Sequence, residues 1–360
     1  MSTIRTRTSA KKESSTSTMT TSSSSATSAH DIHSHGTIHS IRPVTNSHQN
    51  HDDEDEANET TPVIGSGGHS PICHWDDLPT WMQDNPAIFT GYRRPTLSYR
   101  KCAASLGFLH NESVNVWSHL IGAIACIVVA PLAYFKIFHI LETVHWTDMM
   151  HFYIFMAGAI LCLSMSALFH LFSCHSEPVS HQWNRCDYVG IVFLITGSFY
   201  PAIFYGFYCF RTFQIMYIAM ISIFGGATIV AVTKPIFRTP QYRWIRSCLF
   251  LAMGLSAVFP VVHGLVLYGI QLARKAIALD YMVLMGFFYV FGAVLYGTRT
   301  PERFFPGKFD HFGSSHQIFH VCVLLGVLTH FLGVTMAMEF WHDSNHTCSI
   351  PIHEMRASFV

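Results

Sequence analysis

Seven long apolar runs occupy most of the chain and decide what it can fold into. They lie near 116–138, 149–173, 188–208, 212–233, 245–268, 277–297 and 317–340. Each run is long enough to cross about 30 Å of hydrocarbon at a helical rise of about 1.5 Å per residue. Because backbone polar groups cannot stay unpaired in lipid, each run is predicted to be a helix. The sequence therefore predicts an all-α membrane protein with seven transmembrane helices.

The composition agrees with this architecture and argues against other classes of protein. Hydrophobic residues make up 50% of the 360 residues and charged residues 12%, about half the charged fraction of a soluble domain. Lys plus Arg and Asp plus Glu both number 22, so the net positive charge of a nucleic-acid-binding protein is missing. A nucleotide-driven function has no support, because the sequence lacks a phosphate-binding glycine loop.

The chain has ten cysteines and no C-x-x-C motif. Four of them lie within apolar runs, namely Cys126, Cys162, Cys248 and Cys322. Free cysteines are commonly buried in packed interiors, whereas disulfide frameworks are typical of small secreted domains. The sequence therefore predicts buried thiols rather than a disulfide framework.

Outside the apolar runs, composition divides the chain further. Residues 1–72 form a tail whose first 60 residues contain no Phe, Trp or Tyr. Such a tail has too little apolar surface to offset chain entropy, so it is predicted to be disordered. Residues 73–115 combine aromatic and basic side chains ahead of the first run, which predicts a juxtamembrane segment at the membrane interface. Residues 116–340 form the predicted seven-helix domain, and residues 341–360 form a short extracellular tail.

The Lys and Arg residues between the runs predict how the helices are oriented. Twelve of them flank the runs on the amino-terminal side of the bundle, and five lie on the opposite side. Because cytoplasmic loops carry an excess of positive charge, the amino terminus is predicted to be cytoplasmic and the carboxyl terminus to be outside. The plasma membrane is the expected location.

Ionisable residues inside membrane spans are costly and mark functional sites. His316 and His320 are four residues apart, so a helix presents both imidazoles on one face to a single metal ion. His170 follows Ser166 by one helical turn near the end of the second run and offers a third nitrogen. Asp187 precedes the third run and is suited to hold or deprotonate a zinc-bound water. All five lie at the same predicted end of their helices, and three imidazoles with an open fourth position describe a catalytic zinc site.

Spacing alone leaves a second interpretation open. Two histidines on one packed helix face also occur where each imidazole simply hydrogen-bonds to a neighbour. Four other histidines lie in or near the runs and receive no ligand role: His119, His151, His263 and His330.

Six stretches carry a resemblance to known proteins: Asn111–Gly122, Cys174–Glu177, Asp187–Tyr188, Phe237–Pro240, Pro301–Asp310 and Ser315–His320. The last two form a long and specific block. Over residues 75 to 340 the chain resembles the progestin and adipoQ receptor family, and specifically its adiponectin-receptor branch. The resemblance implies seven helices with the amino terminus inside. It implies a zinc ion near the cytoplasmic face, with ligands at His170, His316 and His320, a zinc-water aspartate at Asp187 and a supporting serine at Ser166.

The resemblance also implies a reaction. The adiponectin-receptor branch is associated with hydrolysis of ceramide to a fatty acid and a sphingoid base, and Tyr188 and Arg246 fall where family members contact a lipid head group or carboxylate. The leading hypothesis is a zinc-dependent intramembrane amidohydrolase of the ceramidase type that signals in lipid metabolism. The alternative is a hormone or membrane-state receptor in which zinc is purely structural. Zinc or proton transport is disfavoured, because the predicted site lies at helix ends rather than at the bilayer midplane.

The expected partners follow from the same resemblance. They are a membrane lipid such as ceramide or a fatty acid, an adiponectin-like protein ligand, and cytoplasmic adaptors that bind the amino-terminal tail.

Overall fold

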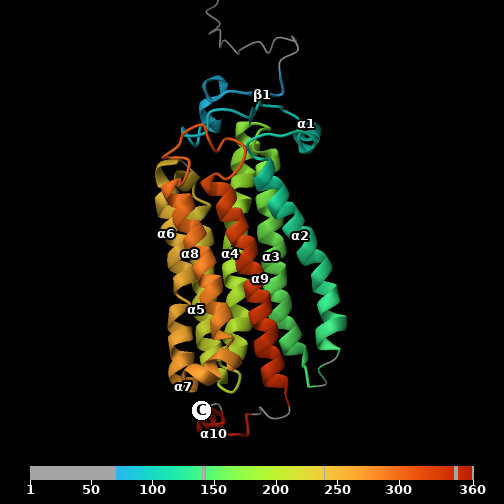
Figure 1. The fold of residues 1–360 in the computed structure, drawn as a ribbon, viewed down its shortest axis with the longest axis vertical. Helices are drawn as coiled ribbons and strands as arrows, with labels where there is room; N and C mark the ends of the chain where they lie inside the picture. The colour runs from blue at the N-terminus through green and yellow to red at the C-terminus, as the bar shows by residue number, and fades with distance from the viewer. Residues whose placement is uncertain (1–69, 140, 142, 239, 344–347, 359–360) are drawn as a thin grey trace, which may run out of the picture. The chain divides into compact units, whose positions relative to one another are not determined.

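The computed structural model describes residues 70–139, 141, 143–238, 240–343 and 348–358. Long helices run side by side along the molecule, with a small sheet and short helices at one end (Figure 1). The predicted tail, residues 1–72, lies mostly outside the described residues. Ile72, at its predicted boundary, belongs to the short strand β1 (Ile72–Cys73).

Among the described residues, seven helical segments are long and apolar enough to cross a membrane, as the sequence predicted. The long helices are α2 (Ser113–Ala133, continued by a π-helical turn at Tyr134–Phe138), α3 (Trp146–Phe172), α4 (Glu177–Gly206), α5 (Arg211–Val232), α6 (Arg243–Leu255), α7 (Val258–Ala276), α8 (Leu279–Thr298) and α9 (Ser315–His342). Helices α6 and α7 together form the fifth span.

Two of these spans differ from the predicted continuous helices, one in where it begins and one in being interrupted. Helix α4 begins at Glu177, well before the apolar run at 188, because Pro178 in its first turn is pre-set for helix initiation. The fifth span is interrupted between α6 and α7, where Ser256 and Ala257 separate the two helices. Pro260, in the first turn of α7, has no N–H to continue the helical hydrogen bonds of α6.

Three helices form the centre of the bundle. In their most hydrophobic stretches, 50% of the residues of α3 and 56% of those of α4 and α9 are buried, against 22% or less in the other four spans. Phe152, Phe155 and Leu163 of α3 are fully buried in this core. Helix α8, by contrast, exposes Val283 and Phe287, as expected where apolar side chains meet lipid.

Small residues let α3 and α4 pack closely. A Cβ atom on Gly158 would lie 2.6 Å from the carbonyl oxygen of Phe193, and one on Gly197 would lie 3.0 Å from that of Ile154. Both neighbours are backbone atoms, so no side-chain rotation would relieve the clash. Close backbone approach at small residues is the usual way in which membrane helices associate, and here it fixes α3, which carries His170, against α4, which carries Asp187.

Replacing Gly158 with alanine is therefore expected to destabilise the bundle. Overpacking of this kind costs about 1–3 kcal/mol, so Gly158→Ala should lower the midpoint of thermal unfolding in detergent. Gly226→Ala is the matched control, because an added Cβ there meets no heavy atom within 4 Å. Equal midpoints for the two variants would show that the contact between α3 and α4 is not limiting for stability.

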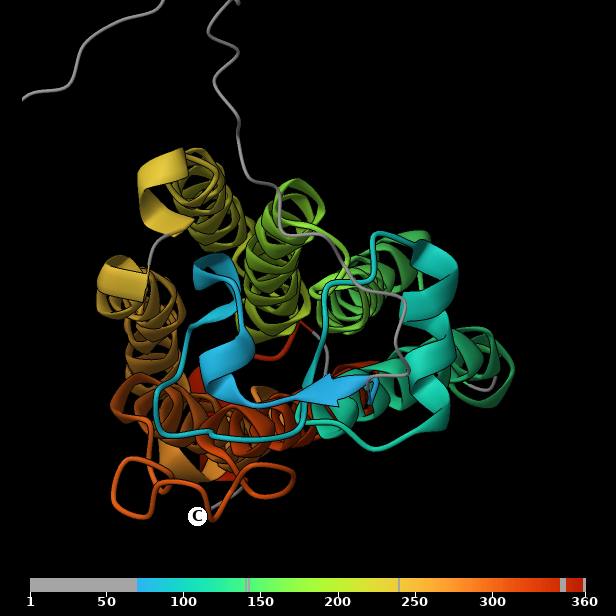
Figure 2. The ribbon, with the colours of Figure 1, turned by 90° about the horizontal axis from the view of Figure 1, so that it is seen from above.

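Residues 70–110 form a cap across one end of the bundle, seen end-on in Figure 2. Strand β1 pairs antiparallel with β2 (Tyr92–Arg93). The cap also contains two short 3-10 helices (Trp75–Asp77 and Thr80–Met82), the short helix α1 (Tyr99–Ala104) and a 3-10 turn (Ser105–Gly107).

Buried hydrogen bonds attach the cap to the helices. The guanidinium of Arg93 donates to the main-chain oxygens of His170 (2.5 Å) and Leu171 (2.9 Å). The carboxylate of Asp310, in the loop between α8 and α9, accepts hydrogen bonds from the Phe89 N–H (3.1 Å) and the Thr90 N–H (2.9 Å). The segment predicted to lie at the membrane interface thus covers the end of the bundle.

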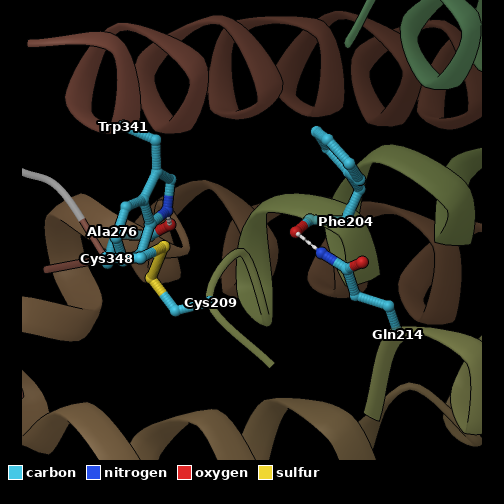
Figure 3. Close-up of a disulfide and its surroundings, with 6 residues drawn as sticks. All are labelled: Phe204, Cys209, Gln214, Ala276, Trp341 and Cys348. Carbon is cyan, nitrogen blue, oxygen red and sulfur yellow. Dashed lines mark hydrogen bonds between the residues drawn. A yellow bond between two sulfur atoms is a disulfide. The ribbon is translucent and has the colours of Figure 1, made fainter. Parts of the chain in front are cut away.

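A disulfide marks the opposite end of the molecule. Cys209, after α4, is bonded to Cys348, which precedes α10 (Ile352–Ala357) (Figure 3). Nearby, the indole N–H of Trp341 donates to the carbonyl of Ala276 (3.0 Å). The sequence favoured buried thiols over a disulfide framework and did not predict this bond. The pair was missed because the two cysteines are 139 positions apart, and no local sequence pattern indicates that they are close in space. A disulfide at this end agrees with its predicted outside location.

The four cysteines that the sequence placed in apolar runs are free thiols. Three of them, Cys126, Cys162 and Cys322, are buried, and Cys248 is exposed.

A buried carboxylate also lies near this end, away from the cap. Asp148, in the first turn of α3, is fully buried. Its Oδ1 accepts hydrogen bonds from Nε2 of His342 and from the hydroxyl of Tyr205, both at 2.9 Å. Its Oδ2 accepts the main-chain N–H of His145 (3.0 Å). The group is thus fully satisfied and ties α3, α4 and α9 together.

Candidate metal centre

Three histidines converge at the capped end of the bundle. His170 lies in the last turn of α3, and His316 and His320 lie in the first two turns of α9. One nitrogen from each imidazole lies within 4.8 Å of the others. His170 and His320 are buried, and His316 is half-buried. The structure therefore brings together the three histidines that the sequence singled out.

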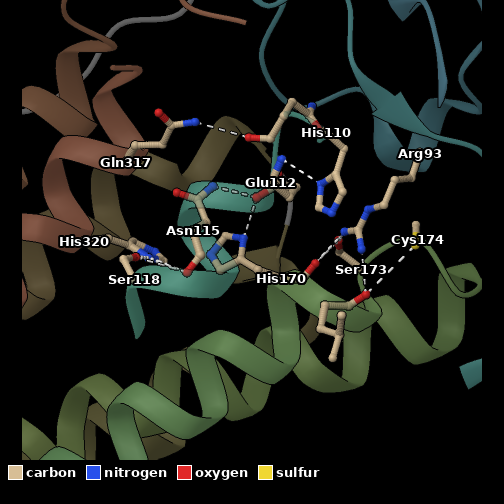
Figure 4. A network of polar contacts seen from close by, with 12 residues as sticks. Arg93, His110, Glu112, Asn115, Ser118, His170, Ser173, Cys174, Gln317 and His320 are labelled. Atoms are coloured by element: carbon tan, nitrogen blue, oxygen red, sulfur yellow. Dashed lines mark hydrogen bonds and ion pairs between the residues drawn. The ribbon is translucent and has the colours of Figure 1, made fainter. Parts of the chain in front are cut away.

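The surroundings of His170 leave one ring nitrogen open. Its Nδ1 lies 2.7 Å from Oε2 of Glu112, whereas its Nε2 is buried and has no hydrogen-bond partner among the described residues (Figure 4). An orphaned buried nitrogen costs about 1–3 kcal/mol unless something binds it. Together with two further imidazoles, this nitrogen is the donor set that a transition metal prefers. The residues present therefore fit a metal ion.

Ser166 and Asp187 lie beside the histidines on the two central helices. Ser166 is one turn before His170 on α3, and Asp187 is in the third turn of α4; both are buried. The Ser166 side chain lies close to the Asp187 carboxylate. Both residues line a cavity that His316 and His320 also line, which places a fixed carboxylate next to the cluster.

Two cavities meet at the cluster. The first, called here the membrane cavity, has a volume of about 370 Å³ and is lined mainly by apolar side chains of α4, α6, α7, α8 and α9. The second, the cap cavity, has a volume of about 430 Å³ and lies beneath the cap, where Glu112 and His170 line it. His316 lines both cavities. The histidines thus separate an apolar chamber from a more polar one.

Tyr188 and Arg246 lie together in the cap cavity. The guanidinium carbon of Arg246 is 5.0 Å from the centroid of the Tyr188 ring, and both residues are buried. Arg246 also donates to the main-chain oxygen of Phe237 and contacts the hydroxyl of Tyr296. The pair thus lines a different cavity from Asp187, which lines the membrane cavity.

The turn that begins α2 contributes site residues that the sequence did not single out. Burial acts to raise the pKa of Glu112, but the facing His170 and His316 and the hydrogen bonds to the carboxylate outweigh it and hold the pKa below its ordinary value. Burial lowers the pKa of His110 to about 3. Its unprotonated Nδ1 accepts the main-chain N–H of Glu112 at 3.1 Å. The Glu112 side chain is thus an ionised carboxylate, and its main chain is held by the hydrogen bond to His110.

A fourth imidazole lies against the cluster. The ring of His119, on α2, stacks on that of His320 with centroids 3.6 Å apart and planes 8° apart. His119 is buried, and neither of its ring nitrogens has a partner among the described residues. No sequence pattern favoured it over His151, His263 or His330, because only the packing of α2 on α9 brings it to the site.

Comparison with known proteins assigns the chain to a family. Residues 108–331 match the model of the haemolysin-III related family. The chain is 39% identical to the adiponectin receptor protein of Drosophila melanogaster, over 78% of this chain and 62% of that protein. It is 40% identical to progestin and adipoQ receptor-like protein 1 of Caenorhabditis elegans, over 73% of this chain and 60% of that protein. It is 39% identical to heptahelical transmembrane protein 1 of Arabidopsis thaliana, over 76% of this chain and 82% of that protein.

The residues that match the family model extend from before the first membrane helix into the last one and include His170, His316 and His320. The chain spans about three fifths of the length of the fly and worm relatives. It is an integral, multi-pass membrane protein of the haemolysin-III related family, similar throughout its membrane domain to adiponectin receptors and to progestin and adipoQ receptor-like proteins.

Proposed function

We propose that this chain is a zinc-dependent intramembrane amidohydrolase that cleaves ceramide-type lipid amides. The observation that carries the proposal is the meeting of three histidine nitrogens within 4.8 Å. Two of these histidines, His316 and His320, line an apolar cavity together with Asp187 and Ser166. A metal-ligand set, a carboxylate base and a lipid-sized apolar chamber are the three parts that such a reaction needs.

Zinc is the metal that suits this donor set. Imidazole nitrogens favour zinc over the harder magnesium and calcium ions, and three protein ligands leave a coordination position open for catalysis. Once bound, Zn²⁺ supplies a Lewis acid and makes a water reactive at neutral pH.

The apolar lining of the membrane cavity suits the hydrocarbon of a lipid substrate. Of the helices that line it, α4 carries Asp187 and α9 carries His316 and His320. A lipid whose acyl chain lies among α6, α7 and α8 therefore directs its amide toward the cluster.

Asp187 and Ser166 act on the proton of the attacking water. Ser166, which lies beside Asp187, holds the carboxylate so that the carboxylate orients the water and takes its proton. The water oxygen bonds to the amide carbon, the carbon–nitrogen bond breaks, and the proton passes from Asp187 to the leaving amine. In the cap cavity, Arg246, beside Tyr188, offers a positive charge to the fatty-acid carboxylate that forms.

The experiment that tests this function is fatty-acid release from ceramide by the purified full chain in lipid nanodiscs. We expect release that stops when a chelator removes zinc and returns when zinc is added back. A chain that holds zinc, unfolds cooperatively and releases no fatty acid from any ceramide would contradict the proposal.

A second candidate function is that of a receptor in which zinc has a structural role. The printed names of the fly and worm relatives contain the word receptor, and the disulfide between Cys209 and Cys348 orders the predicted outer face. This candidate would place the chain in the plasma membrane, with an adiponectin-like protein outside and adaptors on the amino-terminal tail inside. Saturable binding of adiponectin to the chain in nanodiscs, lost on reduction of the disulfide, would favour it.

A further inference from the structure

The first turn of α2 touches two of the three clustered histidines. Oε2 of Glu112 lies 2.7 Å from Nδ1 of His170. The same oxygen accepts a hydrogen bond from the side-chain amide of Asn115 (2.6 Å). The main-chain oxygen of Asn115 lies 3.2 Å from Nδ1 of His320. The segment from Glu112 to Asn115 thus contacts a clustered histidine on α3 and another on α9 (Figure 4).

These contacts decide which nitrogen of each ring carries the proton. A carboxylate and a main-chain carbonyl only accept hydrogen bonds, so the Nδ1 atoms of His170 and His320 donate to them. The Ser118 hydroxyl, 3.4 Å from Nδ1 of His320, gives its own proton to the Asn115 main-chain oxygen at 3.2 Å. In a neutral imidazole the other nitrogen, Nε2, then presents its lone pair. For His170 this is the buried Nε2 that has no partner among the described residues.

The segment is itself held firmly in place. The Glu112 N–H donates to Nδ1 of His110 (3.1 Å), and the His110 N–H donates to the Ser113 hydroxyl (3.0 Å). Asn115 is 3% exposed, and its amide donates to the Glu112 carboxylate that faces His170. The carboxylate is therefore positioned by its own backbone and by Asn115, and does not rely on His170 for its place.

We propose that Glu112 and Asn115 are positioning residues of the metal centre. They lock His170 and His320 in the tautomer that ligates through Nε2, and the Glu112 charge makes the His170 imidazole a stronger donor. Hydrogen bonds of this kind to metal-bound histidines are worth about 10–100-fold in metal affinity. The inference rests on the proposed zinc centre and adds to it the part that the first membrane helix plays.

Glu112→Ala and Glu112→Gln in the full purified chain test the inference. Zinc affinity is measured by competition with a chromophoric chelator, and ligand geometry by the visible absorption of the Co²⁺-substituted protein. We expect affinity to fall by roughly 100-fold in Glu112→Ala, which loses the acceptor and the charge. We expect a fall of roughly 10-fold in Glu112→Gln, which keeps an acceptor oxygen but loses the charge. The Co²⁺ bands should shift in both variants, while the thermal unfolding of Glu112→Gln stays near that of the parent.

Asp148→Asn is the matched control. Asp148 is also a buried carboxylate paired with a histidine, at 2.9 Å from Nε2 of His342, but it lies near the outer end of α3. This variant should keep the zinc affinity and Co²⁺ spectrum of the parent. If the parent holds zinc and Glu112→Gln matches it in affinity and spectrum, the positioning role is wrong and the zinc centre stands. If the parent holds no zinc, the zinc centre and the inference fail together.

Discussion

Replacing His316 with alanine is expected to empty the metal centre. The parent should carry about one zinc per chain, and His316→Ala should carry almost none after gel filtration. Removing a hydrogen-bond partner of a metal ligand lowers metal affinity by roughly 10–100-fold. The zinc affinity of His316→Ala should fall further than this, because one of the three ligands is itself missing. Elemental analysis of the purified proteins measures the zinc content directly.

The control for this result is His263→Ala. His263 lies in α7, where its ring contacts the hydroxyl of Tyr217 at 3.1 Å and packs against Phe213. It is not part of the histidine cluster. Its replacement should leave the zinc content at the parental value. A His316→Ala protein that still holds stoichiometric zinc would show that His170 and His320 do not share a metal with His316.

Replacing Asp187 with asparagine is expected to abolish turnover while zinc is retained. Asparagine has nearly the same shape and can still contact Ser166, but it does not accept the proton of the attacking water. Loss of a general base costs typically about 10²–10⁴-fold in rate. The measurement compares the rate of fatty-acid release at equal zinc content in the parent and in Asp187→Asn.

Ser166→Ala separates the two residues of this pair. It removes the hydroxyl beside the carboxylate but leaves the base, so its rate should fall less than that of Asp187→Asn. Unchanged turnover in Asp187→Asn at full zinc occupancy would rule out Asp187 as the base. The proton would then have to go to another group that lines the membrane cavity, such as His119.

The membrane architecture could be predicted from the sequence because hydrocarbon imposes a length and a composition on each span. The pairing of His316 with His320 was equally accessible, since a four-residue spacing places two side chains on one helix face. The orientation of the chain relative to the membrane stays a prediction from the distribution of Lys and Arg. What the sequence could not show is how helices distant in the chain pack against one another.

Glu112 illustrates this limit. It lies just ahead of the first apolar run, where an acidic residue is ordinary, and nothing local connects it with His170, 58 positions away. Only the packing of α2 against α3 and α9 places its carboxylate on the imidazole. The disulfide between Cys209 and Cys348 was missed for the same reason. The early start of α4 at Glu177 was missed because the predicted bounds followed hydropathy, which marks only the apolar part of a helix. Pro178, which favours the first turn of a helix, marks the true start.

The most direct test of the central claim is fatty-acid release from ceramide in water labelled with oxygen-18. Fatty acid that merely co-purifies in the membrane cavity carries no label, whereas hydrolysis places one labelled oxygen in each new carboxylate. The account predicts labelled fatty acid from the zinc-loaded parent and almost none from Asp187→Asn at equal zinc content. Release of unlabelled fatty acid alone, or equal label from the two proteins, would contradict it.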